Sequence, residues 1–271
     1  MASRVFTAAR ILILTASLGV AGCAGDPAAQ AEYVEEPVAK LYNFAVDALE
    51  KGDYEIASTR FDEVERQHPY STWAIKSQVM AAYSLYMANK YDEAIVSLDR
   101  FIQLHPSNKD TAYAYYLKGL CYYEQISDVG RDQMITELAL KTLNELNTRF
   151  PDSQYTRDAK LKIELTYDHL AGKEIDIGRY YQSKGQYLAA INRFDSVVKR
   201  YQTTTHAPEA LLRLVESYLA LGLREEAKKT ASVLGHNFPS SEWYYDAYAL
   251  LEDPNIRAPE GDGGESWYKF W

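Results

Sequence analysis

The chain has 271 residues, of which 47% are hydrophobic and 25% are charged, as expected for a folded protein of one or two domains. Its 38 acidic and 29 basic residues give a net charge of −9 without a basic stripe, which argues against binding to nucleic acid. The 23 tyrosines outnumber the 8 phenylalanines, and tyrosine suits interfaces because it buries a ring while its hydroxyl stays hydrated.

Residues 1–22 are predicted to be a signal peptide. Arg4 and Arg10 precede or flank the start of an apolar run, and small residues follow before Cys23. The stretch VAGC, which ends at Cys23, resembles a bacterial lipobox, so we expect a lipid on Cys23 of the mature chain. The alternative is ordinary secretory cleavage, with Cys23 an incidental thiol.

Residues 23–36 are polar and rich in alanine, and we interpret them as a lipidated flexible tether. Ala24 is not the aspartate that retains many lipoproteins in the inner membrane, so the resemblance favours the periplasmic face of the outer membrane. If Cys23 is acylated, the remaining Cys121 has no disulfide partner in the chain, and we expect it to be a small buried apolar side chain.

A helical phrase then recurs along the chain. Residues 52–69 and 89–106 align with a shift of 37 positions, which brings Ala57 onto Ala94. Each phrase begins after a turn residue, places an alanine and two apolar residues at spacings of four and three, and ends at a proline. This layout is typical of the second helix of a tetratricopeptide repeat. The five copies of the triplet are Ala57, Phe61, Val64; Ala94, Leu98, Phe101; Ala139, Leu143, Leu146; Ala190, Phe194, Val197; and Ala227, Ala231, Leu234.

The spacing between copies predicts an all-α superhelical solenoid over residues 37–252, with repeats 1–3 in an N-terminal half and repeats 4–5 in a C-terminal half. Extra residues fall at 127–131, interpreted as a loop inside the third repeat. A continuous helical pattern from about Asp158 to Lys184 predicts one long helix that joins the halves. Residues 241–251 are predicted to form a capping helix.

No motif of a hydrolase, a phosphate-binding loop or a zinc enzyme occurs in the sequence, and we predict no catalytic residue, no metal site and no cofactor apart from the lipid. His68 and His105 occupy equivalent positions before Pro69 and Pro106. A metal site would need a further ligand beside them, so we interpret both as exposed turn residues.

The first helix of each repeat lines the concave face of such solenoids. A tyrosine-lined groove there would suit an extended peptide, because the rings offer rigid contact area. The alternative is that the same rings pack between helices, as we expect for Tyr115 and Tyr122. The template assigns to the groove Lys76, Tyr83, Tyr86, Tyr113, Tyr116 and Tyr123.

Residues 253–271 open with proline and glycine and end in WYKFW, which indicates a flexible tail with an aromatic end. The aromatic end resembles the carboxyl terminus of outer-membrane barrel strands. We therefore consider that it docks in the tyrosine groove or on a partner; the alternative is an arm that binds nothing.

Particular phrases resemble the BamD family (ComL/YfiO type) of tetratricopeptide lipoproteins in the outer-membrane β-barrel assembly (BAM) machinery. The phrases are DRFIQLHP (99–106), LKGL (117–120), RDQ (131–133), FPDSQYTRDA (150–159) and GRYYQSKGQYLAAINRF (178–194). The loop at 127–131 is shorter than in some relatives, and the aromatic tail is not a general feature of the family.

This resemblance implies a periplasmic scaffold without catalysis, anchored by palmitate-type acylation. Its C-terminal repeats would bind the POTRA domains of the central barrel component, and its N-terminal repeats would receive unfolded outer-membrane proteins. Arg193 matches the family's basic residue that contacts the last POTRA domain, and accessory lipoproteins are further expected partners. The alternative is another exported tetratricopeptide lipoprotein, such as a pilus-biogenesis pilotin or a cell-envelope coordinator.

Overall fold

The computed structural model of the chain describes residues 35–252, and all regular secondary structure in that range is α-helical, as predicted. The chain divides into two compact units, 1–36 and 37–271, and every described helix belongs to the second. The helices are α1 (Val38–Glu50), α2 (Tyr54–Gln67), α3 (Thr72–Met87), α4 (Tyr91–Leu104), α5 (Thr111–Tyr123), α6 (Met134–Arg149), α7 (Thr156–Ser183), α8 (Tyr187–Arg200), α9 (Ala207–Ala220), α10 (Arg224–Asn237) and α11 (Glu242–Glu252).

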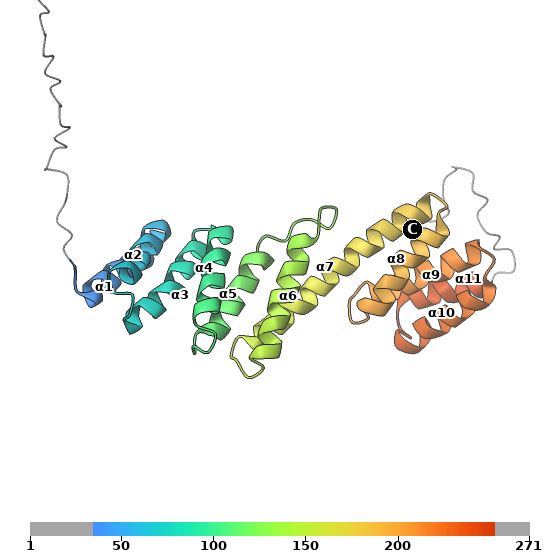
Figure 1. Cartoon of the computed structure of the whole chain (residues 1–271). Helices are drawn as coiled ribbons and strands as arrows, with labels where there is room; N and C mark the ends of the chain where they lie inside the picture. Colours follow the sequence, from blue (N-terminus) through green and yellow to red (C-terminus); the bar gives the residue numbers. More distant parts are fainter. Residues whose placement is uncertain (1–34, 253–271) are drawn as a thin grey trace, which may run out of the picture. The chain divides into compact units, whose positions relative to one another are not determined.

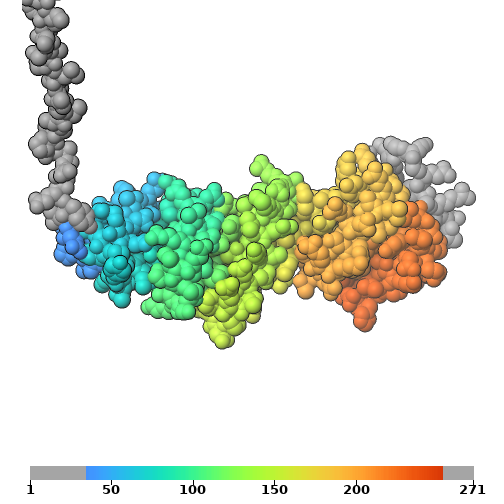
Figure 2. All heavy atoms as spheres, viewed as in Figure 1, coloured from blue at the N-terminus to red at the C-terminus, as the bar shows by residue number. Residues whose placement is uncertain are grey.

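Each helix packs mainly against its neighbours in the sequence (Figure 1). The odd-numbered helices also pack against one another in series, from α1 with α3 through to α9 with α11. The backbones of the even-numbered helices in the described range lie farther apart, and α2 and α4 are linked by the ion pair of Glu65 with Arg100. Figure 2 shows the same order, since the colours of the described helices follow one another without mixing. Paired helices stacked in this way form a tetratricopeptide solenoid, in which the odd helices make one face.

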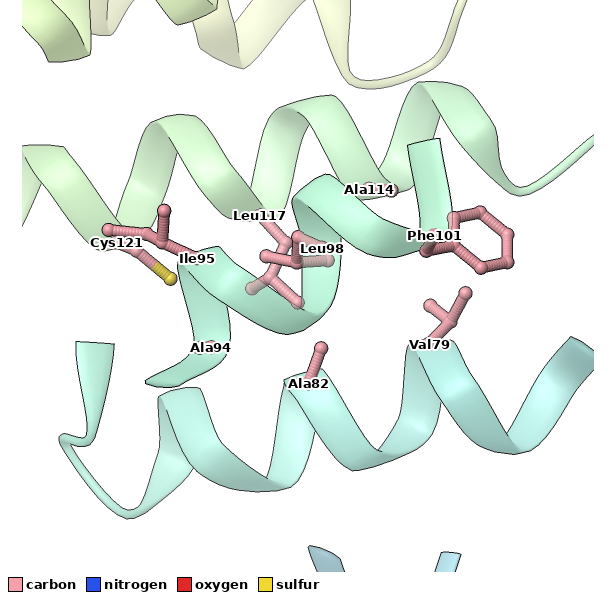
Figure 3. Packing of buried hydrophobic residues seen from close by; sticks show 9 residues of the cluster. All are labelled: Val79, Ala82, Ala94, Ile95, Leu98, Phe101, Ala114, Leu117 and Cys121. Carbon is pink, nitrogen blue, oxygen red and sulfur yellow. The ribbon is translucent and has the colours of Figure 1, made fainter. Parts of the chain in front are cut away.

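The repeated triplets form the contact between the two helices of each pair. All fifteen side chains are buried, and only Ala231, at 6% exposure, is not almost fully enclosed. Figure 3 shows the second repeat, where Ala94, Leu98 and Phe101 of α4 lie between α3 and α5. Cys121 of α5 is buried in the same cluster, and its burial raises the thiol pKa to about 12, so it is the inert apolar residue that the sequence predicted.

The turns inside four of the repeats share one conformation. The residue at the turn has a φ angle between 59° and 83° in each case: Gly52, Asn89, Gly185 and Gly222. In this left-handed region a Cβ atom causes steric strain, so glycine is favoured and asparagine is tolerated. The next residue donates its N–H back across the end of the helix, as when Lys90 donates to the carbonyl of Leu85 at 2.9 Å. This is the Schellman arrangement, and it fixes the antiparallel return of the second helix.

The second helices also end alike. Their C-caps are His68, His105, Phe150, Tyr201 and Phe238, with φ near −130° and ψ between 42° and 61°. A proline follows four of them and keeps the preceding residue out of the helical region. Tyr201 adopts the same geometry although Gln202 follows it, so the packing of the repeat is sufficient to end the helix there.

The two histidines are less exposed than the sequence predicted. His68 and His105 are both half-buried, and the ring of His105 lies 5.2 Å from that of Phe101. The side chain at the C-cap lies against the last turn of its own helix, so this position is partly buried and is not a fully solvated turn.

The insertions lie where they were predicted. Residues 124–133 connect α5 to α6, and Lys173 of α7 donates to the carbonyl of Gly130 in this connection at 3.0 Å. Helix α7 packs through its first half on α6 and through its second half on α8 and α9, so it joins the two halves of the solenoid as one continuous helix.

Two first helices carry a glycine opposite the large residue of the triplet. A Cβ added to Gly178 would lie 2.4 Å from the ring of Phe194, and one added to Gly119 would lie 2.5 Å from Leu143. No real Cβ tolerates such contacts, so the absence of a side chain sets how closely α7 approaches α8 and α5 approaches α6.

We predict that Gly178→Ala lowers the free energy of unfolding by about 1–3 kcal/mol, because the new methyl group must displace a fully buried ring. Gly172→Ala, in the same helix, is the matched control. Its Cβ would lie 3.2 Å from the partly exposed His206, which can move, and alanine favours the helix. Urea denaturation followed by circular dichroism measures both; equal stability of the two variants would contradict the close approach.

Candidate functional site

The groove residues predicted from the sequence lie on α3 and α5, two neighbouring members of the odd-helix row. Tyr83 and Tyr86 come from α3, and Tyr113 and Tyr116 come from α5. Tyr155 joins them from the turn before α7, with its ring 5.1 Å from each of Tyr113 and Tyr116. We call these five side chains the tyrosine face.

The tyrosine face is both core and surface. Tyr83, Tyr86 and Tyr113 pack against the cluster that contains Leu98 and Leu117, yet each keeps part of its surface accessible. By contrast, Tyr115 is almost fully buried, as expected, and Tyr122 packs partly buried on the other side of α5. The inner edges of the rings therefore hold the helices together, while the outer edges remain available for a ligand.

Burial moves three phenols of this face further from ionisation. It raises the pKa of Tyr86 to about 12 and raises the pKa of Tyr113 and Tyr116 well above the usual range. The Tyr116 hydroxyl donates to Asp158 Oδ2 at 2.6 Å, and that bond is the main reason why the pKa of Asp158 is lowered. At neutral pH Tyr86, Tyr113 and Tyr116 therefore present uncharged hydroxyls.

Lysines lie at both borders of the tyrosine face. Lys162 of α7 pairs with Asp158 at 3.0 Å, and its Nζ lies 5.5 Å from the ring centre of Tyr123. On the side of α1, Lys76 of α3 is exposed and its Nζ lies 5.2 Å from the ring centre of Tyr42. The predicted residues Lys76 and Tyr123 thus each take part in a cation–ring contact, Lys76 with Tyr42 and Tyr123 with Lys162.

Arg193 lies on α8, apart from the tyrosine face. Its Nη1 is 3.2 Å from Glu174 Oε2 of α7, and its side chain is 42% exposed. The contact with Glu174 holds the guanidinium in a fixed place between α7 and α8. Because that contact engages only one of the guanidinium nitrogens, the other N–H groups can be offered to a partner carboxylate.

A buried ionic network links α7 and α9 in the C-terminal half. Glu209 and Glu216 of α9 are buried, and Arg213 contacts both, with bonds of 3.2 and 3.0 Å to the two oxygens of Glu216. From α7, Arg179 Nε donates to Glu209 at 2.8 Å and Gln182 donates to Glu216 at 3.0 Å. Burial dominates over these partners and raises the pKa of Glu216.

Three residues at or near the start of α7 were not predicted from the sequence. Tyr155 belongs to the tyrosine face, and Asp158 and Lys162 border it. The signal was present in the phrase FPDSQYTRDA, because the residues after Pro151 occupy the start of the next first helix, as those after Pro106 do. Glu174 was missed as the partner of Arg193, since a pairing between helices cannot be found from spacing within one helix.

Several predictions concern residues outside the described range: the signal peptide, Cys23, the tether and the aromatic tail. Within residues 35–252, no helix is long and apolar enough to cross a membrane. The same residues contain no group of three or more metal-ligating side chains placed to hold an ion.

Comparison with known proteins gives one consistent family. Residues 34–234 match the family described as YfiO, outer membrane lipoprotein. The chain is 51% identical over 251 residues to the outer membrane protein assembly factor BamD of Caulobacter vibrioides, covering 93% of this chain and 82% of that protein. It is 47% identical over 241 residues to the protein of the same name from Rickettsia prowazekii, covering 89% and 95%. The protein of that name from Neisseria meningitidis serogroup A is 32% identical over 275 residues, covering 96% and 98%.

These matches span the solenoid from its first helix into the fifth repeat and include every phrase on which the resemblance was based. The chain belongs to the YfiO family of outer-membrane lipoproteins, together with the BamD assembly factors.

Proposed function

We propose that this protein is a lipid-anchored scaffold on the periplasmic face of the outer membrane, where it helps β-barrel proteins to fold and insert. Membership of the family whose relatives are named outer membrane protein assembly factors is the observation that carries the proposal. It favours this function over that of a pilotin or a cell-envelope coordinator. In this role the protein binds and positions other chains and carries out no reaction.

The C-terminal repeats are the proposed docking site for POTRA domains, with Arg193 at its centre. The guanidinium is exposed and held in place by Glu174, so it loses little freedom when it binds a carboxylate. The buried network of Glu209, Arg213 and Glu216 belongs to the same half, and removing Arg213 from it would take a cationic partner from both buried glutamates.

The N-terminal repeats are the proposed site for unfolded barrel substrates. A barrel strand before insertion is an extended chain with aromatic residues on one side and unsatisfied backbone groups along its edges. The tyrosine face offers ring edges to the aromatic side chains and protonated hydroxyls to the backbone carbonyls. This combination supports weak, sequence-tolerant capture of such segments.

We predict that Arg193→Ala weakens binding to the isolated POTRA domains of the central barrel component by about tenfold or more, since it leaves a partner carboxylate unpaired. Lys199→Ala is the matched control. Lys199 lies on the same helix, is 71% exposed and pairs with Asp195 within α8. Isothermal titration measures both; equal losses would indicate general charge attraction and contradict a specific Arg193 contact.

For the tyrosine face, we predict that the double variant Tyr83→Ser, Tyr113→Ser weakens binding of a synthetic C-terminal barrel strand by about tenfold or more. The variant with phenylalanine at both positions should keep most of the affinity if ring contacts dominate. Tyr70→Ser, at a fully exposed position between α2 and α3, is the control. Fluorescence anisotropy gives the affinities and circular dichroism checks the fold. Unchanged binding by a folded serine variant would remove this face from the proposal.

The anchor has its own test. Replacing residues 1–23 by an ordinary cleavable secretory signal removes Cys23 without leaving an uncleaved apolar segment, and this variant should move out of the membrane fraction of cells because the lipid is the proposed anchor. Fractionation and the mass of the amino-terminal peptide provide the readout. Retention of the variant in the membrane, or an unmodified Cys23 in the native protein, would contradict the lipid anchor.

A further inference from the structure

The last described helix, α11, occupies the position of a first helix without a following partner in the described range. It contacts α9 and α10, just as α9 contacts α7 and α8. In every complete repeat a second helix then packs on the first. The described chain ends with α11 at Glu252, so the side of α11 that would receive a second helix has none among the residues 35–252.

The outer side of α11 is not that of a polar cap. Trp243, Tyr244, Ala247 and Leu250 face the cluster shared with α9 and α10. Tyr245 is 62% exposed and Tyr248 is 53% exposed, and both rings contact that of Tyr244, with ring centres 5.9 and 6.4 Å apart. Solenoids generally need terminal units with a polar outer side to remain soluble, so a row of exposed rings at this end calls for a cover.

The charges on α11 indicate what kind of cover fits. The helix carries Glu242, Asp246 and Glu252 and no basic residue. The hydroxyl of Tyr248 is hydrogen-bonded to Glu252, and this bond raises the pKa of Tyr248. One of the two exposed tyrosines therefore already has a carboxylate partner on α11. A segment that combines aromatic rings with a positive charge would match both the rings and the carboxylates of this side.

The chain itself supplies such a segment among the nineteen residues that follow α11. The sequence WYKFW at 267–271 contains four aromatic residues around Lys269. The connecting residues 253–266 include two prolines and three glycines, and extended they reach about 45 Å, whereas α11 is about 16 Å long. The aromatic end can therefore return along the whole length of α11.

We propose that residues 267–271 dock on the exposed Tyr245–Tyr248 row of α11 and close the C-terminal end of the solenoid. The rings of the tail take the place of the missing second helix, and Lys269 faces the acidic residues of α11. This assignment does not depend on the proposed function, since it concerns only the end of the fold.

Hydrogen–deuterium exchange of the full chain in detergent tests the proposal. Replacing the four rings of 267–271 by serine keeps the length and charge of the tail and should speed amide exchange in α11 by about fivefold or more. The double variant Tyr245→Ser, Tyr248→Ser should have the same effect, and combining both changes should add little, because each removes the same contact.

Two controls make the result specific. Tyr180→Ser removes a ring of similar exposure from α7, and Glu260→Gln changes the tail outside its aromatic end; both should leave exchange in α11 unchanged. Three results would overturn the proposal: unchanged exchange in α11 without the tail rings, a change confined to the tyrosine face, or an effect that depends on protein concentration and so reports a second copy.

Discussion

The structure depends on one recurrent contact, in which the side chains of a triplet on each second helix fill the space against the first helix of the same pair. Where the first helix carries a glycine, as at Gly119 and Gly178, the large residue of the triplet lies directly on its backbone. This contact sets the distance and the angle within each pair. The odd-numbered helices also contact one another in series, so their outward sides form one surface. Contacts between helices far apart in the sequence are not needed for this surface.

That local mode of assembly explains how one protein can carry two different surfaces. In the N-terminal half, tyrosines fill the gaps between α3, α5 and the start of α7, and their outer edges remain accessible. In the C-terminal half, the equivalent space between α7 and α9 is filled by a satisfied network of carboxylates and guanidinium groups. Aromatic contacts adapt to many ligands, whereas a fixed charge network favours one geometry. The difference fits the proposal that the N-terminal half receives varied chains and the C-terminal half binds one partner.

Helix α7 connects these surfaces mechanically. Its first half belongs to the core of the third repeat and its second half to the core of the fourth, and its 28 residues form one uninterrupted helix. A continuous hydrogen-bonded helix resists bending more strongly than a turn between two helices does. Lys162 and Asp158 near one end and Arg179 and Gln182 near the other therefore lie on one continuous helix, which contacts the tyrosine face through Asp158 and the ionic network through Arg179 and Gln182.

The sequence by itself determined the all-α repeat fold, the five triplets, the long central helix and the presence of a last helix, because each depends on periodicity and turn residues within a short stretch. It also placed the groove tyrosines on the right helices. Only the tertiary structure decided that these rings are half-buried, that Tyr155 and Asp158 complete their face, that Glu174 holds Arg193, and that Glu209 and Glu216 are interior. Each of these depends on which side chains of different helices meet. The periodicity of one helix states which residues share a side, but the neighbour that covers that side is fixed only when the helices pack.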